Sequence, residues 1–187
     1  MKNFLFKYKY IIIIIIVLLV IGIFFTFNNI TKDDDNISLI TFQQPIVTIS
    51  NELPITDEVG KDIDIQSNKS KTTGYLEFEV KSNVEKKVKY EIYLTKNDVK
   101  SEIPTNFVKV YLTDFNNVVY NQNNHSSVLT YSDLDNFNDD QDSKILYTGL
   151  LTGKKSQKFR LRMWVADTYG LIADTRMFST KISVRVK

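Results

Sequence analysis

The chain has 187 residues, and 24 Lys and Arg against 22 Asp and Glu give a formal net charge of +2. So small a charge, part of it carried by lysines near the N-terminus, gives no support for nucleic-acid binding. Cysteine is absent and histidine occurs once, so we expect neither disulfides nor a zinc site with the usual ligands. The ~150 residues beyond the apolar run described next suffice for one domain with its own core.

Residues 11–27 form an apolar run without charge or proline. As a helix of about 17 residues the run is roughly 26 Å long, close to the thickness of a membrane's hydrocarbon core. No small-residue cleavage site follows the run, and it exceeds the usual length of a cleavable signal. The sequence therefore predicts an uncleaved signal anchor that crosses the membrane once and contacts its lipid.

The flanks of the run set its orientation. Lysines precede it and a triplet of aspartates follows it: Lys2, Lys7, Lys9 and Asp33, Asp34, Asp35. The positive-inside rule then predicts a cytoplasmic N-terminus (1–10) and an extracellular C-terminal domain (37–187) in the cell membrane. Residues 28–36 are polar, and they are predicted to form a spacer between the anchor and the domain.

Beyond the spacer the pattern is that of an all-β domain. Apolar residues alternate with polar ones in the segments 75–80, 87–95, 108–112, 158–165 and 176–186. No segment after the anchor keeps a helical period for three turns. Less regular strands are expected within 37–50, at 118–120 and at 144–152. Seven to nine short strands predict an immunoglobulin-like antiparallel β-sandwich, with a closed barrel as the alternative.

Two strand pairs are predicted from short connections. A hairpin is expected between 75–80 and 87–95. The strands 158–165 and 176–186 are expected to be adjacent and antiparallel, with Leu161 and Ile182 both in the core between the sheets.

Other elements are predicted from less regular sequence patterns. Pro45 interrupts the apolar stretch 37–50, and a proline there marks an edge, a bulge or a place where a strand crosses from one sheet to the other. A short strand is expected at 62–66 and one helical turn within 131–137.

The residues offer no catalytic site. His125 lies in a polar stretch typical of an exposed loop, and a serine nucleophile would have to use it. No Gly-x-Ser-x-Gly elbow occurs. We therefore expect no enzyme activity and no cofactor.

A weak candidate for a cation loop has side-chain oxygens spaced two residues apart: Asn136, Asn138, Asp140 and Asp142. An EF-hand loop needs glycine at its sixth position and glutamate at its twelfth, where this chain has Gln141 and Tyr147. The favoured interpretation is a solvated acidic loop without a metal.

The best surface candidate is the outward row of the strand 158–165. It consists of basic residues and one aromatic: Lys158, Arg160, Arg162 and Trp164. Such a row suits an acidic glycan or a partner strand. The alternative is a solvated face on which Trp164 packs under a loop.

Residues 51–187 resemble a loose group of single-pass surface proteins of low-GC Gram-positive bacteria. The resemblance lies in the strand sequences 159–168 and 176–186, and in 51–58 and 108–114 upstream. That group is distantly similar to the camelysin and TasA-type biofilm-fibre proteins. The resemblance implies an exported β-sandwich that associates with itself or with the envelope, and it carries over no functional residue.

Two functions from different classes follow. The first is a membrane-anchored extracellular structural or adhesive module of the bacterial surface, which binds itself, other envelope proteins or glycans. The alternative is an accessory subunit of an envelope machine for secretion, division or competence.

Overall fold

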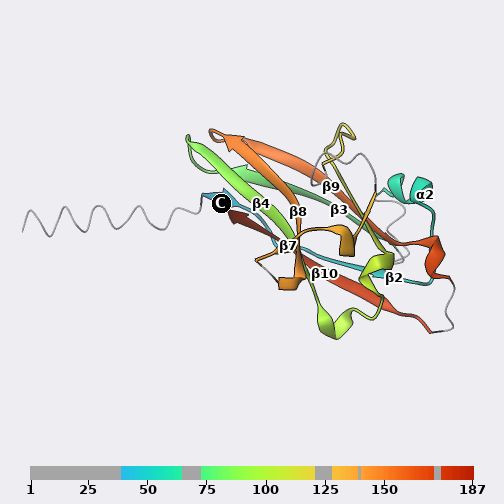
Figure 1. Ribbon diagram of the computed structural model, residues 1–187. Coiled ribbons are helices and arrows are strands. Elements are labelled where there is room, and N and C mark those ends of the chain that lie inside the picture. The colour runs from blue at the N-terminus through green and yellow to red at the C-terminus, as the bar shows by residue number, and fades with distance from the viewer. Residues whose placement is uncertain (1–38, 65–72, 121–127, 139, 171–173) are drawn as a thin grey trace, which may run out of the picture. The chain divides into compact units, whose positions relative to one another are not determined.

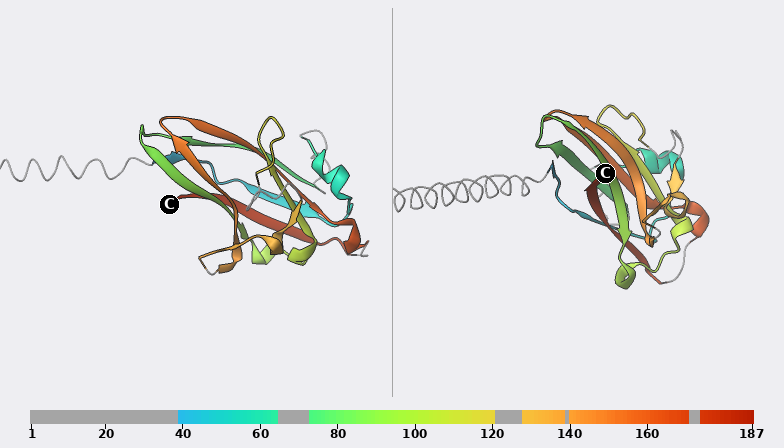
Figure 2. Two further views of the ribbon diagram at one scale, coloured as in Figure 1. Left: turned by 45° about the horizontal axis from the view of Figure 1, so that its top comes forward. Right: turned by 60° about the vertical axis from the view of Figure 1, so that its left-hand side comes forward.

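The computed structural model describes residues 39–64, 73–120, 128–138, 140–170 and 174–187. They form one compact unit that is mostly β, with two antiparallel sheets packed face to face as a β-sandwich (Figures 1 and 2). The predicted anchor at 11–27 and the spacer at 28–36 lie outside the described residues. Within the described ranges no helix is long and apolar enough to cross a membrane.

Each sheet has five strands. Sheet A has the order β1 (Ile40–Thr41), β3 (Gly74–Ser82), β9 (Ser156–Val165), β5 (Val108–Thr113) and β6 (Leu129–Thr130). Sheet B has the order β2 (Ile46–Ser50), β10 (Met177–Val186), β4 (Lys87–Lys96), β8 (Asp140–Thr152) and β7 (Asn136–Phe137). The helical elements are short: α2 (Asp57–Lys61) and the 3₁₀ turns η3 (Asp98–Lys100), η4 (Thr105–Phe107), η6 (Tyr131–Asp133) and η7 (Asp167–Tyr169).

The strand pairs are nested along the chain. β2 pairs with β10, β3 with β9, β4 with β8 and β5 with β6. This nested order over two sheets is the topology of a jelly roll. An immunoglobulin domain instead keeps its first two strands together in one sheet and pairs its last two in the other. The two-sheet sandwich is therefore confirmed, whereas the immunoglobulin-like arrangement is wrong, and the two separate sheets exclude the closed barrel.

Both predicted strand pairs are wrong. β3 lies in sheet A and β4 in sheet B, and β9 and β10 are divided in the same way. The period of two identifies which side chains face the core, but it carries no information about the neighbouring strand. Leu161 and Ile182 are both fully buried in the core, as expected, although they come from opposite sheets.

The crossing at Pro45 is confirmed. β1 pairs with β3 in sheet A, and β2 pairs with β10 in sheet B. Pro45 lies between these strands, and its carbonyl accepts a hydrogen bond from the backbone N–H of Ile182 at 2.9 Å. Proline has no N–H to leave unpaired at such a crossing.

The helical turn expected within 131–137 is present as η6. The strand expected at 62–66 is absent from its described part, 62–64. The helix α2 lies just before it, and the hydroxyl of Thr56 caps this helix by accepting from the N–H of Val59. A single turn has no helical periodicity to detect, so only the cap and the acidic first turn could have indicated it.

Candidate functional site

The predicted binding face on β9 is divided by the segment that carries α2. Lys158 is exposed and Arg160 is half-buried, whereas Arg162 is 6% and Trp164 0% exposed. The expectation of one continuous exposed row is therefore wrong. Alternation correctly placed all four side chains on the outer face of sheet A, but it cannot reveal that another part of the chain covers half of that face.

Trp164 lies under α2, much as in the alternative interpretation, although a helix replaces the expected loop. Gly60 of α2 is buried against the indole ring, where no side chain would fit. The backbone of Ile55 donates to Val165 and accepts from Asp167, which ties the segment before α2 to the end of β9. The indole Nε1 has no hydrogen-bond partner among the described residues.

Arg162 is a buried cation on the same face. Its Nε donates to the carbonyl of Ile63 at 2.7 Å and its Nη1 to the hydroxyl of Thr113 at 3.0 Å. Its guanidinium lies 5.7 Å from the ring centre of Tyr75. Burial lowers the pKa of Arg162, because a charged group is less stable away from water.

The half-buried Arg160 forms the accessible part of the row together with the exposed Lys158. Its Nε is 3.0 Å from the carboxylate of Glu77, and its guanidinium lies 4.3 Å from the ring centre of Phe115. The hydroxyl of Tyr75 also donates to Glu77, at 2.6 Å. The hydrogen bond from Tyr75, followed by that from Arg160, holds the pKa of Glu77 below its usual value.

A polar pocket of about 430 Å³ opens beside these arginines, between the end of α2, β5 and β9. Apart from one isoleucine, its lining residues are charged or polar, and they come from three parts of the chain: Lys61, Asp62, Ile63, Asp64, Tyr111, Asn117, Arg160 and Arg162. Sequence reasoning found only the two arginines. Tyr111 was detectable as an outward residue of β5, but nothing in the sequence brings α2 to the same place.

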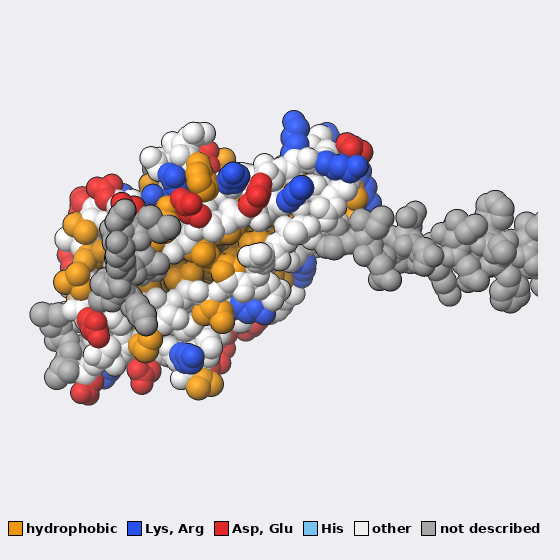
Figure 3. Space-filling model, turned by 180° about the vertical axis from the view of Figure 1, so that it is seen from behind, with side chains coloured by type: hydrophobic (Ala, Val, Ile, Leu, Met, Phe, Trp, Pro, Cys, Tyr) orange, Lys and Arg blue, Asp and Glu red, His pale blue; other side chains and the backbone are white. Residues whose placement is uncertain are grey.

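A second pocket, of about 560 Å³, follows the edge of β3. β1 pairs only with Lys81 and Ser82, so no other described strand lies along the rest of this edge. Its lining combines aromatic and charged side chains: Phe42, Phe78 and Phe115 with Glu77, Glu79, Lys81 and Lys158. In Figure 3 hydrophobic side chains form a band across one face of the molecule, with both signs of charge around them.

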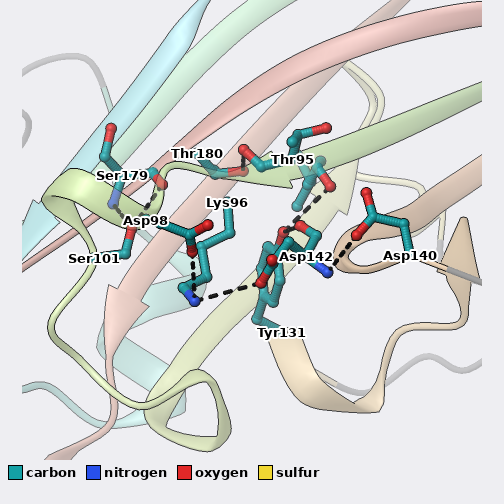
Figure 4. Close-up of polar contacts among 10 residues, drawn as sticks. Thr95, Lys96, Asp98, Ser101, Tyr131, Asp140, Asp142, Ser179 and Thr180 are labelled. Atoms are coloured by element: carbon teal, nitrogen blue, oxygen red, sulfur yellow. Dashed lines mark hydrogen bonds and ion pairs between the residues drawn. The ribbon is translucent and has the colours of Figure 1, made fainter.

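The candidate cation-loop residues do not converge on one point. Each binds a different group: Asn136 accepts from Lys144, Asn138 from Arg185 and Asp140 from the N–H of Asp142, while Asp142 pairs with Lys96. The ammonium of Lys96 lies 2.9 Å from Asp98 and 3.4 Å from Asp142 (Figure 4). The hydrogen bond to Asp98, more than the nearby charge of Asp142, raises the pKa of Lys96.

The ammonium group of Lys96 thus lies between the carboxylates of Asp98 and Asp142. No group of three or more His, Cys, Asp or Glu side chains in the described ranges is arranged to hold a metal ion. His125 lies outside those ranges.

No family model, curated protein or solved structure matches this chain. The resemblance to exported surface proteins stays a prediction.

Proposed function

We propose that this protein is a membrane-anchored extracellular structural or adhesive module of the bacterial cell surface, without catalytic activity. The observation that carries the proposal is the uncharged run 11–27, with lysines before it and aspartates after it. A single segment of this kind serves as an anchor that leaves the following domain outside the cell.

The sandwich suits such a role. Its core is continuous between the sheets and includes residues from both: Ile92, Leu94, Phe178 and Ile182 with Val110, Phe159 and Leu161. The chain has no cysteine, so the domain does not depend on disulfides. The two pockets described above lie on the surface of the sandwich, and pockets of this size can hold small ligands.

The test is the topology of the full-length chain in bacterial cells. Protease added to intact cells or protoplasts is expected to digest the part from residue 28 onward, while a tag on residues 1–10 stays protected. Recovery of a soluble form that starts near residue 28 would contradict the anchor. Protection of the C-terminal domain would contradict its extracellular location.

Cross-linking in intact membranes tests the structural or adhesive role. Self-cross-links, or links to envelope glycans, are the expected result. A fixed set of other membrane proteins in constant ratio would instead identify the chain as an accessory subunit of an envelope machine.

A further inference from the structure

Arg162 is a buried cation that makes no ion pair among the described residues, although Asp62 lies near enough for its charge to favour the charged form. Both of its hydrogen-bond acceptors, the carbonyl of Ile63 and the hydroxyl of Thr113, are neutral. No ion pair joins Arg162 to a carboxylate in the part of the chain that the structure describes. A charge removed from water without an opposite charge is costly, and proteins usually provide a partner for it.

One nitrogen of this guanidinium has no hydrogen bond among the described residues. Nε and Nη1 make the two hydrogen bonds, and Nη2 makes none among the described residues. Arg162 lines the pocket, and its Nη2 is not among the fully buried side-chain atoms without a hydrogen-bond partner. An N–H of a guanidinium makes a charge-assisted hydrogen bond to a carboxylate oxygen, which is stronger than a hydrogen bond between neutral groups.

The rest of the lining limits which anion fits. Lys61 and Arg160 add positive charge, although Arg160 is already paired with Glu77 at 3.0 Å. Asp62 and Asp64 line the same pocket. These carboxylates repel a doubly charged anion such as phosphate more strongly than a singly charged carboxylate.

One of these acidic side chains suits hydroxyl groups. A carboxylate accepts hydrogen bonds only, so Asp62 matches a ligand that carries O–H donors. Asn117 both donates and accepts, and the half-buried ring of Tyr111 offers an apolar surface. The pocket volume of about 430 Å³ lies within the usual range for small ligands.

We propose that this pocket binds an acidic sugar of the uronic acid type, with its carboxylate on Arg162 and its hydroxyl groups on the acidic rim. The inference rests on the proposed function, because an extracellular domain meets envelope glycans. It names the ligand class that the adhesive role leaves open.

Titration calorimetry on the full-length chain, in a detergent without a sugar headgroup, tests the ligand. Glucuronate is expected to bind about ten-fold or more tightly than glucose, because charge-assisted hydrogen bonds are the stronger kind. Inorganic phosphate and acetate are the matched probes for a bare anion, and both are expected to bind more weakly than glucuronate. Equal affinity for glucose, or phosphate or acetate binding as tightly as glucuronate, would overturn the proposal, as would no binding of glucuronate.

Two variants locate the site. Arg162→Lys keeps the charge but loses the planar set of N–H donors that bonds Ile63, Thr113 and the ligand, and Lys61→Glu reverses a charge on the half-buried rim without touching the core. Both are expected to weaken glucuronate binding, while Lys181→Glu, on an exposed position of sheet B, leaves it unchanged. Should Arg162→Lys fail to fold, Lys61→Glu still decides, and unchanged binding in Lys61→Glu overturns the proposal. Failure here leaves the topology test above untouched, so the two proposals fail separately.

Discussion

Glu91 is a buried carboxylate whose partners come from the C-terminal end of the chain. Its side chain is 2% exposed and lies 2.9 Å from Arg185 and 2.6 Å from Lys187. Burial alone would raise its pKa, but the hydrogen bonds from Lys187 and Arg185 outweigh burial and hold the pKa below its ordinary value. Arg185 also lies 4.2 Å from the ring centre of Phe137, which stacks on Tyr93.

This lowered pKa makes stability depend on pH. A group whose pKa is lower in the folded state stabilises the fold above its unfolded value of 4.5, and this contribution is lost as the pH falls through the folded value. We therefore expect Glu91→Gln to lower the free energy of unfolding at pH 7 by about 1–3 kcal/mol, and to lower it less at pH 3. Urea unfolding of the full-length chain, followed by fluorescence of its single tryptophan, measures both values.

The control is Glu79→Gln, at an exposed position of β3, which is expected to change stability by less than about 0.5 kcal/mol at either pH. A loss for Glu91→Gln that is equal at both pH values would show that the charge of Glu91 is not what stabilises this end of the sheet.

For single residues, the sequence predicts which face of the sheet a side chain lies on better than it predicts whether that side chain is buried. Val108, Val110 and Leu112 face the core as their alternation predicts. Glu91 and Arg162 also point outward as predicted, yet both are buried by partners that lie 94 and 99 residues away in the chain. Alternation is a local property, so it cannot report a cover that comes from elsewhere.

Among the secondary elements, α2 determines the shape of the candidate site. It packs on β9 through the buried Gly60, which leaves room for the indole ring of Trp164. Lys61, the next residue, lines the polar pocket. The position of the pocket wall therefore depends on how closely the helix approaches the sheet.

Gly60→Ala tests this contact. The added methyl group would overlap the indole ring, so either the helix or the ring must move. Overpacking of this kind typically destabilises a protein by about 1–3 kcal/mol. We expect a lower melting temperature by circular dichroism and, if the pocket binds as proposed, weaker glucuronate binding.

The matched control is Gly170→Ala, in a turn where a methyl group would meet no atom within 4 Å. Gly170 has a φ of 74°, so this change strains the backbone without touching the pocket. It is expected to lower stability while leaving glucuronate binding intact. A Gly60→Ala protein with unchanged melting temperature would show that α2 does not pack tightly on Trp164.

The strands themselves were largely predictable, because each buries one face and therefore alternates. The predicted strand 87–95 is observed as β4, and 158–165 lies within β9. The short β6 and β7 have two residues each, too few for any periodicity. The site depends on α2 and on the loop after β5, whose positions are fixed by tertiary contacts alone.

For the whole molecule, the decisive feature is the nesting of strand pairs. The outermost of these pairs joins β2 to β10 at one edge of sheet B. It therefore brings together strands from near the beginning and the end of the domain's sequence. Thr48 and Ser179 are partners in this pair, and their hydroxyl oxygens are 3.1 Å apart although 131 residues separate them. Because the sequence predicted neighbouring strands as partners, this contact is a direct test of the topology.

The chain lacks cysteine, so a double substitution can form only the disulfide that it introduces. Thr48→Cys with Ser179→Cys is expected to oxidise readily in the folded protein, because cross-strand partners have suitable Cα separations. Closing so long a loop restricts the unfolded chain, and by that argument it raises stability by up to about 5 kcal/mol. Gel mobility with and without reductant detects the bond, and melting under both conditions measures its effect. The control pair, Lys158→Cys with Lys181→Cys, places exposed cysteines on different sheets and is expected to form no intramolecular bond. Rapid oxidation of the control pair, without oxidation of the pair at 48 and 179, would indicate that β9 and β10 are neighbours in one hairpin and would refute the jelly roll.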